Sequence, residues 1–176
     1  AAYSIPFSDG RVLWIFGDTF YGNERVINED YTQMVHNSIG ISTCQDGVWN
    51  LEYFIRGIND TSPEAFFSPN TSDYFYWAMD GVYYNDELWI SLLRVEFSNN
   101  GMGFDSCGSD LARVSNLGPD PLNWTITIYP LVENGTKAYP VSSLLIEGDY
   151  LYMFALYEVD SRPMILTRIP LSQLSQ

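Results

Sequence analysis

Two aspartates are attached to apolar stretches in a way that could serve acid–base chemistry. Asp18 follows the apolar run Val12-Leu-Trp-Ile-Phe16 and one glycine, and Asp80 lies inside the apolar segment 79–84. A positioned carboxyl group can give or accept a proton during a reaction. Asp is also a common turn residue that accepts backbone N–H groups, so Asp18 could instead only close a turn. For Asp80 a functional role is favoured, because a charge inside an apolar strand is costly without a partner.

Three neutral or weakly basic side chains could assist such carboxyl groups. His36 is the only histidine of the chain, which excludes a histidine-based metal site, and we predict no metal site. His36 and the adjacent Asn37 could bind a substrate or could be buried residues with structural hydrogen bonds. Trp77 could stack on a sugar ring, although most aromatic side chains of a sequence so rich in them belong to a core.

Two further charged residues complete the set of candidates. Arg94 could orient a carboxylate or act as the counter-ion of Asp80. Glu158 stands beside Val159 and Asp160 at the end of a predicted strand, where it could act as an acid or be an ordinary solvated residue. The segment 105–110 offers oxygen ligands but lacks the glutamate and the spacing of a helix-loop-helix calcium site.

Short β-strands are the elements that must position these residues. Aromatic residues make up 16% of the chain, which favours strands. Apolar runs alternate with turn sequences such as Ser8-Asp9-Gly10 and Gln45-Asp46-Gly47, as expected for hairpins. The expected strands are 3–7, 12–16, 37–43, 48–54, 79–84, 87–95, 109–114, 124–129, 141–146, 150–158 and 164–169, with a polar loop at 22–33.

The strands recur in the same order, which predicts a repeat. The triplets Leu13-Trp14-Ile15, Leu88-Trp89-Ile90 and Leu151-Tyr152-Met153 occupy one place in each copy. Four antiparallel strands per copy are typical of a β-propeller blade, so we predict a single all-β domain, 1–176, with blades at about 1–60, 74–131 and 138–176. The third copy lacks its fourth strand, so the ring is partial or is completed by association or by a missing remainder. A β-sandwich with unrelated hairpins is the alternative.

In such blades the candidate residues would share one rim. The start of the first strand, the end of the second and the start of the third lie at the same end of a four-stranded antiparallel sheet. The residues expected at this rim are Ala1, Ala2, Asp18, His36, Asn37, Trp77, Asp80, Arg94, Tyr139, Tyr157 and Glu158.

Composition excludes several classes of function. The formal net charge of −14 argues against nucleic acid as a partner, since its binding needs a basic face. No apolar run approaches the length of a membrane helix, so no membrane insertion is expected. Cys44 and Cys107 could form one disulfide or remain two thiols. The chain does not open with Met, which is compatible with removal of a leader.

Four segments near the start resemble a known group of proteins. They are Tyr3-Ser-Ile-Pro-Phe7, Asp9-Gly-Arg-Val-Leu-Trp14, Phe16-Gly-Asp-Thr-Phe20 and Met34-Val-His-Asn-Ser-Ile-Gly-Ile41. These segments are similar to uncharacterised-domain families with a five-bladed β-propeller fold, related to furanosidase- and arabinanase-type glycoside hydrolases. Some members of that group are reported to act on arabinan-type polysaccharides. The remainder of the chain matches them only in its strand pattern.

The resemblance implies a carbohydrate-active glycoside hydrolase, secreted or at the cell surface, that needs no cofactor. Its partner would be a polysaccharide or oligosaccharide. Two carboxyl groups are needed for this chemistry, and the consistent assignment is Asp18 as base, Asp80 as the group that sets a pKa or orients substrate, and Glu158 as acid. Related hydrolases carry a catalytic carboxylate at the start of the first inner strand, where this chain has Ala1-Ala2-Tyr3. The alternatives are a non-catalytic glycan-binding or assembly module, or an inactive partial propeller.

Overall fold

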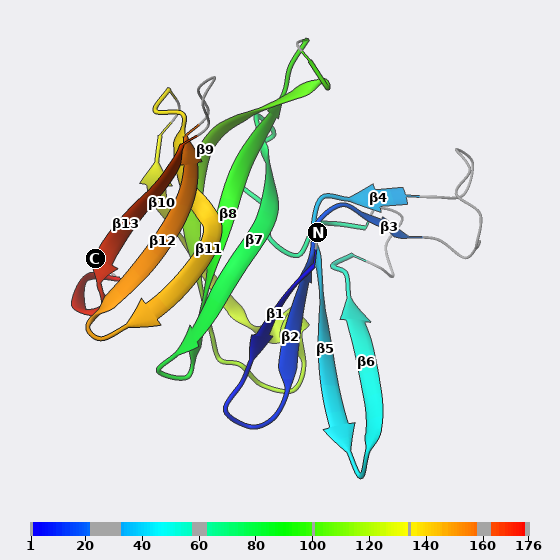
Figure 1. Cartoon of the computed structure of the whole chain (residues 1–176). Coiled ribbons are helices and arrows are strands. Elements are labelled where there is room, and N and C mark those ends of the chain that lie inside the picture. Colours follow the sequence, from blue (N-terminus) through cyan, green and yellow to red (C-terminus); the bar gives the residue numbers. More distant parts are fainter. Residues whose placement is uncertain are drawn as a thin grey trace.

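The chain folds into antiparallel β-sheets (Figure 1). The computed structural model describes residues 2–21, 33–57, 63–99, 101–133, 135–157 and 163–174. Within these ranges there is no α-helix, only the 3₁₀ turns η1 (Pro121–Asn123) and η2 (Leu171–Gln173). Accordingly, none of the described residues belongs to a helix long and apolar enough to span a bilayer. The prediction of an all-β chain is confirmed.

Three larger sheets and one small hairpin make up the described part of the fold. The first sheet has the order β1 (Ala2–Pro6), β2 (Val12–Phe16), β5 (Ser38–Gln45), β6 (Val48–Phe54). The second sheet consists of β7 (Phe75–Tyr84), β8 (Glu87–Phe97), β9 (Phe104–Ser115) and β10 (Thr125–Val132), in that order. The third sheet contains β11 (Ala138–Glu147), β12 (Tyr150–Tyr157) and β13 (Met164–Pro170). The small hairpin pairs β3 (Thr19–Tyr21) with β4 (Gln33–Val35).

The second sheet lies between the other two and is apolar on both faces. Leu88, Ile90 and Leu92 of β8 join the core shared with the first sheet. Trp89, from the same strand, joins the core shared with the third sheet. Successive side chains of a strand point to opposite faces, so β8 must be apolar at consecutive positions. This explains the unbroken run Leu88-Trp-Ile in the sequence.

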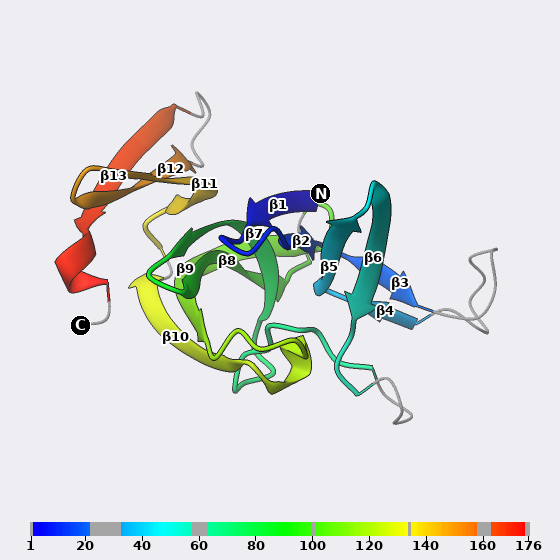
Figure 2. The same ribbon diagram turned by 90° about the horizontal axis from the view of Figure 1, so that it is seen from below.

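The first strands of the three sheets lie next to one another. β7 contacts both β1 and β11, and the view from below shows these strands near the middle of the molecule while β6, β10 and β13 lie at the outside (Figure 2). The first strands of the first and third sheets therefore both lie beside β7, the first strand of the second sheet.

The two cysteines differ in environment, and neither is paired. Cys44 is exposed and Cys107 is buried. Burial, helped by the charge of Glu96, raises the pKa of the Cys107 thiol to about 11. Since the thiolate is the reactive form, we expect one fast-reacting thiol with 5,5′-dithiobis(2-nitrobenzoic acid) at pH 8 and a second only after denaturation. In Cys44→Ser the fast reaction should vanish; a fast reaction that persists there would contradict the burial of Cys107.

Candidate functional site

Asp18, His36 and Trp77 come together at the upper end of the first and second sheets. The Trp77 indole Nε1 donates a hydrogen bond to Asp18 Oδ1 at 3.0 Å. His36 Nδ1 lies 3.4 Å from the same oxygen. The Asp18 side chain is 41% exposed, so the carboxylate is held on one side and open to solvent on the other. His36 and Trp77, which are 18 and 59 positions away from Asp18 in the chain, thus join it in one polar cluster.

Strand register accounts for the meeting of Asp18 and His36. Phe16 pairs with Ser38 across β2 and β5, and Thr19 pairs with Val35 across β3 and β4. Positions 18 and 36 lie between these pairs in the same antiparallel register, so they are direct cross-strand neighbours. The Thr19 hydroxyl donates to the Gly17 carbonyl at 2.8 Å and fixes the bend that carries Asp18. The polar loop predicted at 22–33 in fact ends in strand β4; positions 22–32 lie outside the described residues.

Further aromatic rings pack against this cluster. The His36 ring stacks on Phe75 with 3.5 Å between the ring centroids. Phe97 meets Phe75 at 5.3 Å, and Trp77 meets Phe104 edge-on at 4.9 Å. Phe97 is 76% exposed although it is a large apolar residue. We call Asp18 and the rings of His36, Phe75, Trp77, Phe97 and Phe104 the aromatic rim.

Asp80 occupies a different position, at the junction of the second and third sheets. Its carboxylate accepts hydrogen bonds from the Gly81 N–H at 2.8 Å, the Ser143 hydroxyl at 2.9 Å and the Leu144 N–H at 2.8 Å. Burial and the negative charge of Asp80 raise the pKa of the neighbouring Tyr3 phenol. At the usual rise per residue, Asp80 lies about 10 Å further along β7 than Trp77. Its partners are uncharged donors, so they supply the compensation that a charge in an apolar strand requires.

A β-bulge puts Asp80 in this place. The register of β7 against β8 shifts between Ala78 and Gly81, and such a bulge re-aims the side chains that follow it. A Cβ atom at Gly81 would lie 2.5 Å from Ile90 Cδ1 and 2.6 Å from Ile5 Cδ1. It would also lie 2.9 Å from the Trp89 carbonyl oxygen of the neighbouring strand, so glycine is the residue that fits directly after Asp80.

Asn37 is fully buried, and its side chain forms hydrogen bonds with backbone groups. The amide nitrogen donates to the carbonyls of Phe67 and Tyr76, both at 2.9 Å, and the amide oxygen accepts from the Phe67 N–H at 2.7 Å. These contacts tie the segment at Phe67 to the start of β7. Asn37, predicted to contact substrate, is placed here as a residue that positions the neighbouring strands.

Arg94 points to the face of the second sheet that is opposite to the face of Trp77. It pairs with Asp110 rather than with Asp80. Its guanidinium group forms a two-pronged ion pair with the buried Asp110 carboxylate, with Nε donating at 2.9 Å. The Tyr76 hydroxyl donates to the same carboxylate. Burial and this contact raise the pKa of Tyr76, and the pKa of Arg94 is raised by its bonds to Asp110. Both groups therefore keep their protons at neutral pH.

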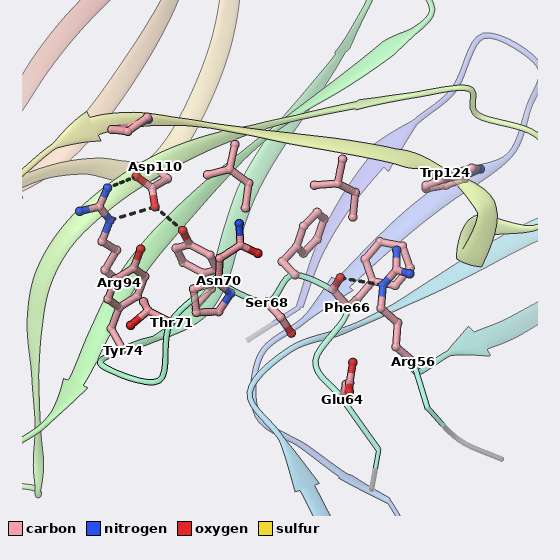
Figure 3. Close-up of a pocket in the computed structure, with 16 residues that line it drawn as sticks. Arg56, Glu64, Phe66, Ser68, Asn70, Thr71, Tyr74, Arg94, Asp110 and Trp124 are labelled. Carbon is pink, nitrogen blue, oxygen red and sulfur yellow. Dashed lines mark hydrogen bonds and ion pairs between the residues drawn. The ribbon is translucent and has the colours of Figure 1, made fainter. Parts of the chain in front are cut away.

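The Arg94–Asp110 pair closes one end of a groove of about 600 Å³ (Figure 3). The groove runs between the segment 64–71 and strand β10, with Arg56 and Trp124 at its other end. Neither the groove nor the ion pair of Asp110 is predicted from the sequence, where Asp110 stands out only as an oxygen ligand in the segment 105–110.

Comparison with known proteins gives the family and the fold. No curated protein matches the chain. The sequence matches the family described as a domain of unknown function (DUF5005) over residues 1–176. The chain belongs to this family. Its fold is similar to the crystal structure of a "putative hydrolase" from Bacteroides ovatus ATCC 8483, with a TM-score of 0.53 at 18% identity over 96% of this chain. The chain spans 65% of the length of that protein.

For this member of the DUF5005 family, the structure thus brings together three of the predicted site residues. Asp18, His36 and Trp77 share one cluster. Asp80 and Arg94 belong to separate clusters, and Asn37 is internal. Glu158 lies outside the described residues. The rings of Phe75, Phe97 and Phe104 are additions that only the strand register reveals.

Proposed function

We propose that this chain is a glycan-acting hydrolase domain of furanosidase or arabinanase type, with its site at the aromatic rim. The observation that carries the proposal is the partly exposed carboxylate of Asp18, which Trp77 and His36 contact beside half-buried aromatic rings and the exposed ring of Phe97. A sugar presents apolar C–H faces and polar edges, which suit aromatic rings placed around a carboxylate. The Bacteroides ovatus protein, a "putative hydrolase", supports the same broad class through the likeness in fold alone.

The rim offers defined roles for its side chains. Asp18 would act as the base, because its second carboxylate oxygen is not taken up by Trp77 or His36. Trp77 would fix the orientation of the carboxylate, and Phe97 would contact the sugar ring. Hydrolysis of a glycosidic bond needs a second carboxyl group as acid, and Glu158 remains our candidate. We assign Asp80 to positioning, since three donors hold its carboxylate against the third sheet.

We also propose that the sheets are blades of a β-propeller within a single domain, 1–176. Support comes from the second sheet, which packs its two faces on the sheets beside it. The outer sheets still expose large apolar side chains: Trp49 and Tyr53 on β6, and Leu145 and Leu166 on the third sheet. Such surfaces favour burial by further sheets, from a longer chain or from a second copy. A secreted or cell-surface location follows from a polysaccharide substrate.

A screen of polysaccharides tests the proposed function. We expect the purified protein to release reducing ends from at least one furanoside polymer, with arabinan tested beside xylan, galactan and β-glucan. Binding to a polymer without any product would favour the glycan-binding module, for which the exposed ring of Phe97 is the specific observation. Neither product nor binding across the panel would contradict both.

A further inference from the structure

The groove beside the Arg94–Asp110 pair has the properties of a binding site that is separate from the aromatic rim. Its volume of about 600 Å³ lies in the range of ligand pockets in proteins. On one side, the segment 64–71 contributes the polar side chains of Ser68, Asn70 and Thr71 together with apolar ones. Strand β10 runs along the opposite side (Figure 3), and its lining residues Ile126, Ile128 and Pro130 are aliphatic. A ligand that fits must therefore have one polar and one apolar side along its length.

The groove is electrically balanced although the chain is strongly acidic. Its charged lining residues are Arg56, Arg94, Glu64 and Asp110, two of each sign. The guanidinium of Arg94 is bound to Asp110, and that of Arg56 donates to the Phe66 carbonyl at 3.1 Å. The charge of Arg94 is thus matched by Asp110, and backbone carbonyls accept two of the N–H groups of Arg56. These contacts favour an uncharged ligand.

The geometry of β10 distinguishes a sugar from a peptide as the occupant. Ile126, Ile128 and Pro130 alternate along the strand, so β10 turns a face of side chains toward the groove rather than its hydrogen-bonding edge. A peptide that adds to a sheet needs the edge. A pyranose or furanose ring can place its C–H face on the aliphatic wall and its hydroxyl groups on Asn70 and Thr71. No side chain of the described residues bonds to the Asn70 amide, which is exposed.

We propose that this groove binds a neutral oligosaccharide at a site separate from the aromatic rim. Tyr76 and Trp77 are adjacent residues of β7 that point to opposite faces: the Tyr76 hydroxyl reaches Asp110 in the groove, and the Trp77 indole reaches Asp18 at the rim. The groove and the aromatic rim therefore lie on opposite faces of β7. The groove would hold a glycan chain whether or not the rim hydrolyses it.

Tryptophan signals in NMR spectra test the proposal site by site. The chain has 5 tryptophans, of which Trp124 borders the groove and Trp77 belongs to the rim. In protein labelled with ¹⁵N-tryptophan, titration with arabinotetraose, xylotetraose or cellotetraose should shift the Trp124 indole signal in a saturable manner for at least one sugar. In the variant Asn70→Ala/Thr71→Val, the dissociation constant read from Trp124 should rise about tenfold, through the loss of hydrogen bonds to the ligand.

A matched variant and the Trp77 signal separate the possible outcomes. Thr127 lies on β10 but on the face away from the groove, so Thr127→Val should leave the Trp124 titration unchanged. The proposal is overturned if the Trp124 signal shifts with none of the sugars at millimolar concentration. It is also overturned if the dissociation constant is the same in Asn70→Ala/Thr71→Val and in the wild-type protein. A Trp124 signal that shifts only with a charged glucuronate oligomer or a peptide would overturn it as well. A response at Trp124 without one at Trp77 supports the groove and counts against the rim.

Discussion

Replacing Asp18 by Asn is expected to lower the rate of reducing-end release by about 10²–10⁴-fold, the usual contribution of a group that transfers protons in the reaction. Asn is nearly the same size and its side-chain oxygen can still accept the hydrogen bond of Trp77, so the rim should keep its geometry. What is lost is the negative charge and the ability to take a proton. The initial rate on the best polymer of the screen measures the effect.

Asp46→Asn is the matched control for this substitution. Asp46 is an exposed turn residue with a φ of +51°, a conformation that Asn tolerates well, and it lies in the β5–β6 turn away from the rim. Its variant should hydrolyse at the wild-type rate. Equal rates for Asp18→Asn and the wild-type protein would remove Asp18 from the mechanism, whatever the fold.

Replacing Asp110 by Ala is expected to lower the free energy of unfolding by about 3–5 kcal/mol, the usual cost of breaking a buried ion pair from one side. The Arg94 side chain is 12% exposed and would keep a charge without its main partner. The Tyr76 hydroxyl would lose its acceptor as well. For a chain of this length the melting temperature should fall by roughly 10 °C, which thermal unfolding followed by circular dichroism can measure.

Two variants test the physical reason for this loss. Glu133→Gln removes the other acidic partner of Arg94, which is 76% exposed, and should cost less than about 1 kcal/mol. The double variant Asp110→Ala/Arg94→Leu removes both buried charges and should recover part of the stability lost in Asp110→Ala. A double variant less stable than Asp110→Ala would show that the unpaired charge of Arg94 is not the cause.

The sheets could be predicted because their strands obey simple alternation between clear turns. The strands Val12–Phe16 and Val48–Phe54 have the predicted bounds. The turn residues Asp46, Asn85 and Asp86 all adopt positive φ, as hairpin turns of this kind require. The third sheet has three strands, as expected from the sequence. Alternation and turn chemistry are local properties, so one sequence suffices to recognise them.

Strand β9 shows where local patterns fail. It begins at Phe104, although the sequence indicated a start at Ser109. The segment Ser106-Cys-Gly108 has no apolar alternation, yet pairing with the long strand β8 extends β9 through it. Likewise, β3 and β4 are too short to show a pattern in the sequence. They form because the pairing of β2 with β5 continues in the same register beyond Asp18. Such pairing depends on partners far along the chain.

Within the candidate site, side-chain direction was the property that the sequence could not supply. Asp18, His36 and Trp77 were predicted to share a rim and do meet. Asp80 was expected with them, but the bulge at Ala78–Gly81 turns it toward the third sheet. A second shift of register, between Arg94 and Val95, lies where Arg94 faces Asp110. A bulge changes the face to which every later side chain of the strand points, and no residue type predicts a bulge reliably.

The ends of the first and second sheets hold the Asp18 carboxylate against the Trp77 indole. The most direct measurement is the ¹⁵N–¹H spectrum of tryptophan-labelled Asp18→Ala beside the wild-type protein. We predict that among the 5 indole signals the Trp77 signal shifts most and that its proton exchanges faster with water, because its acceptor is gone. A Trp77 signal that stays in place and keeps its exchange rate would contradict this claim.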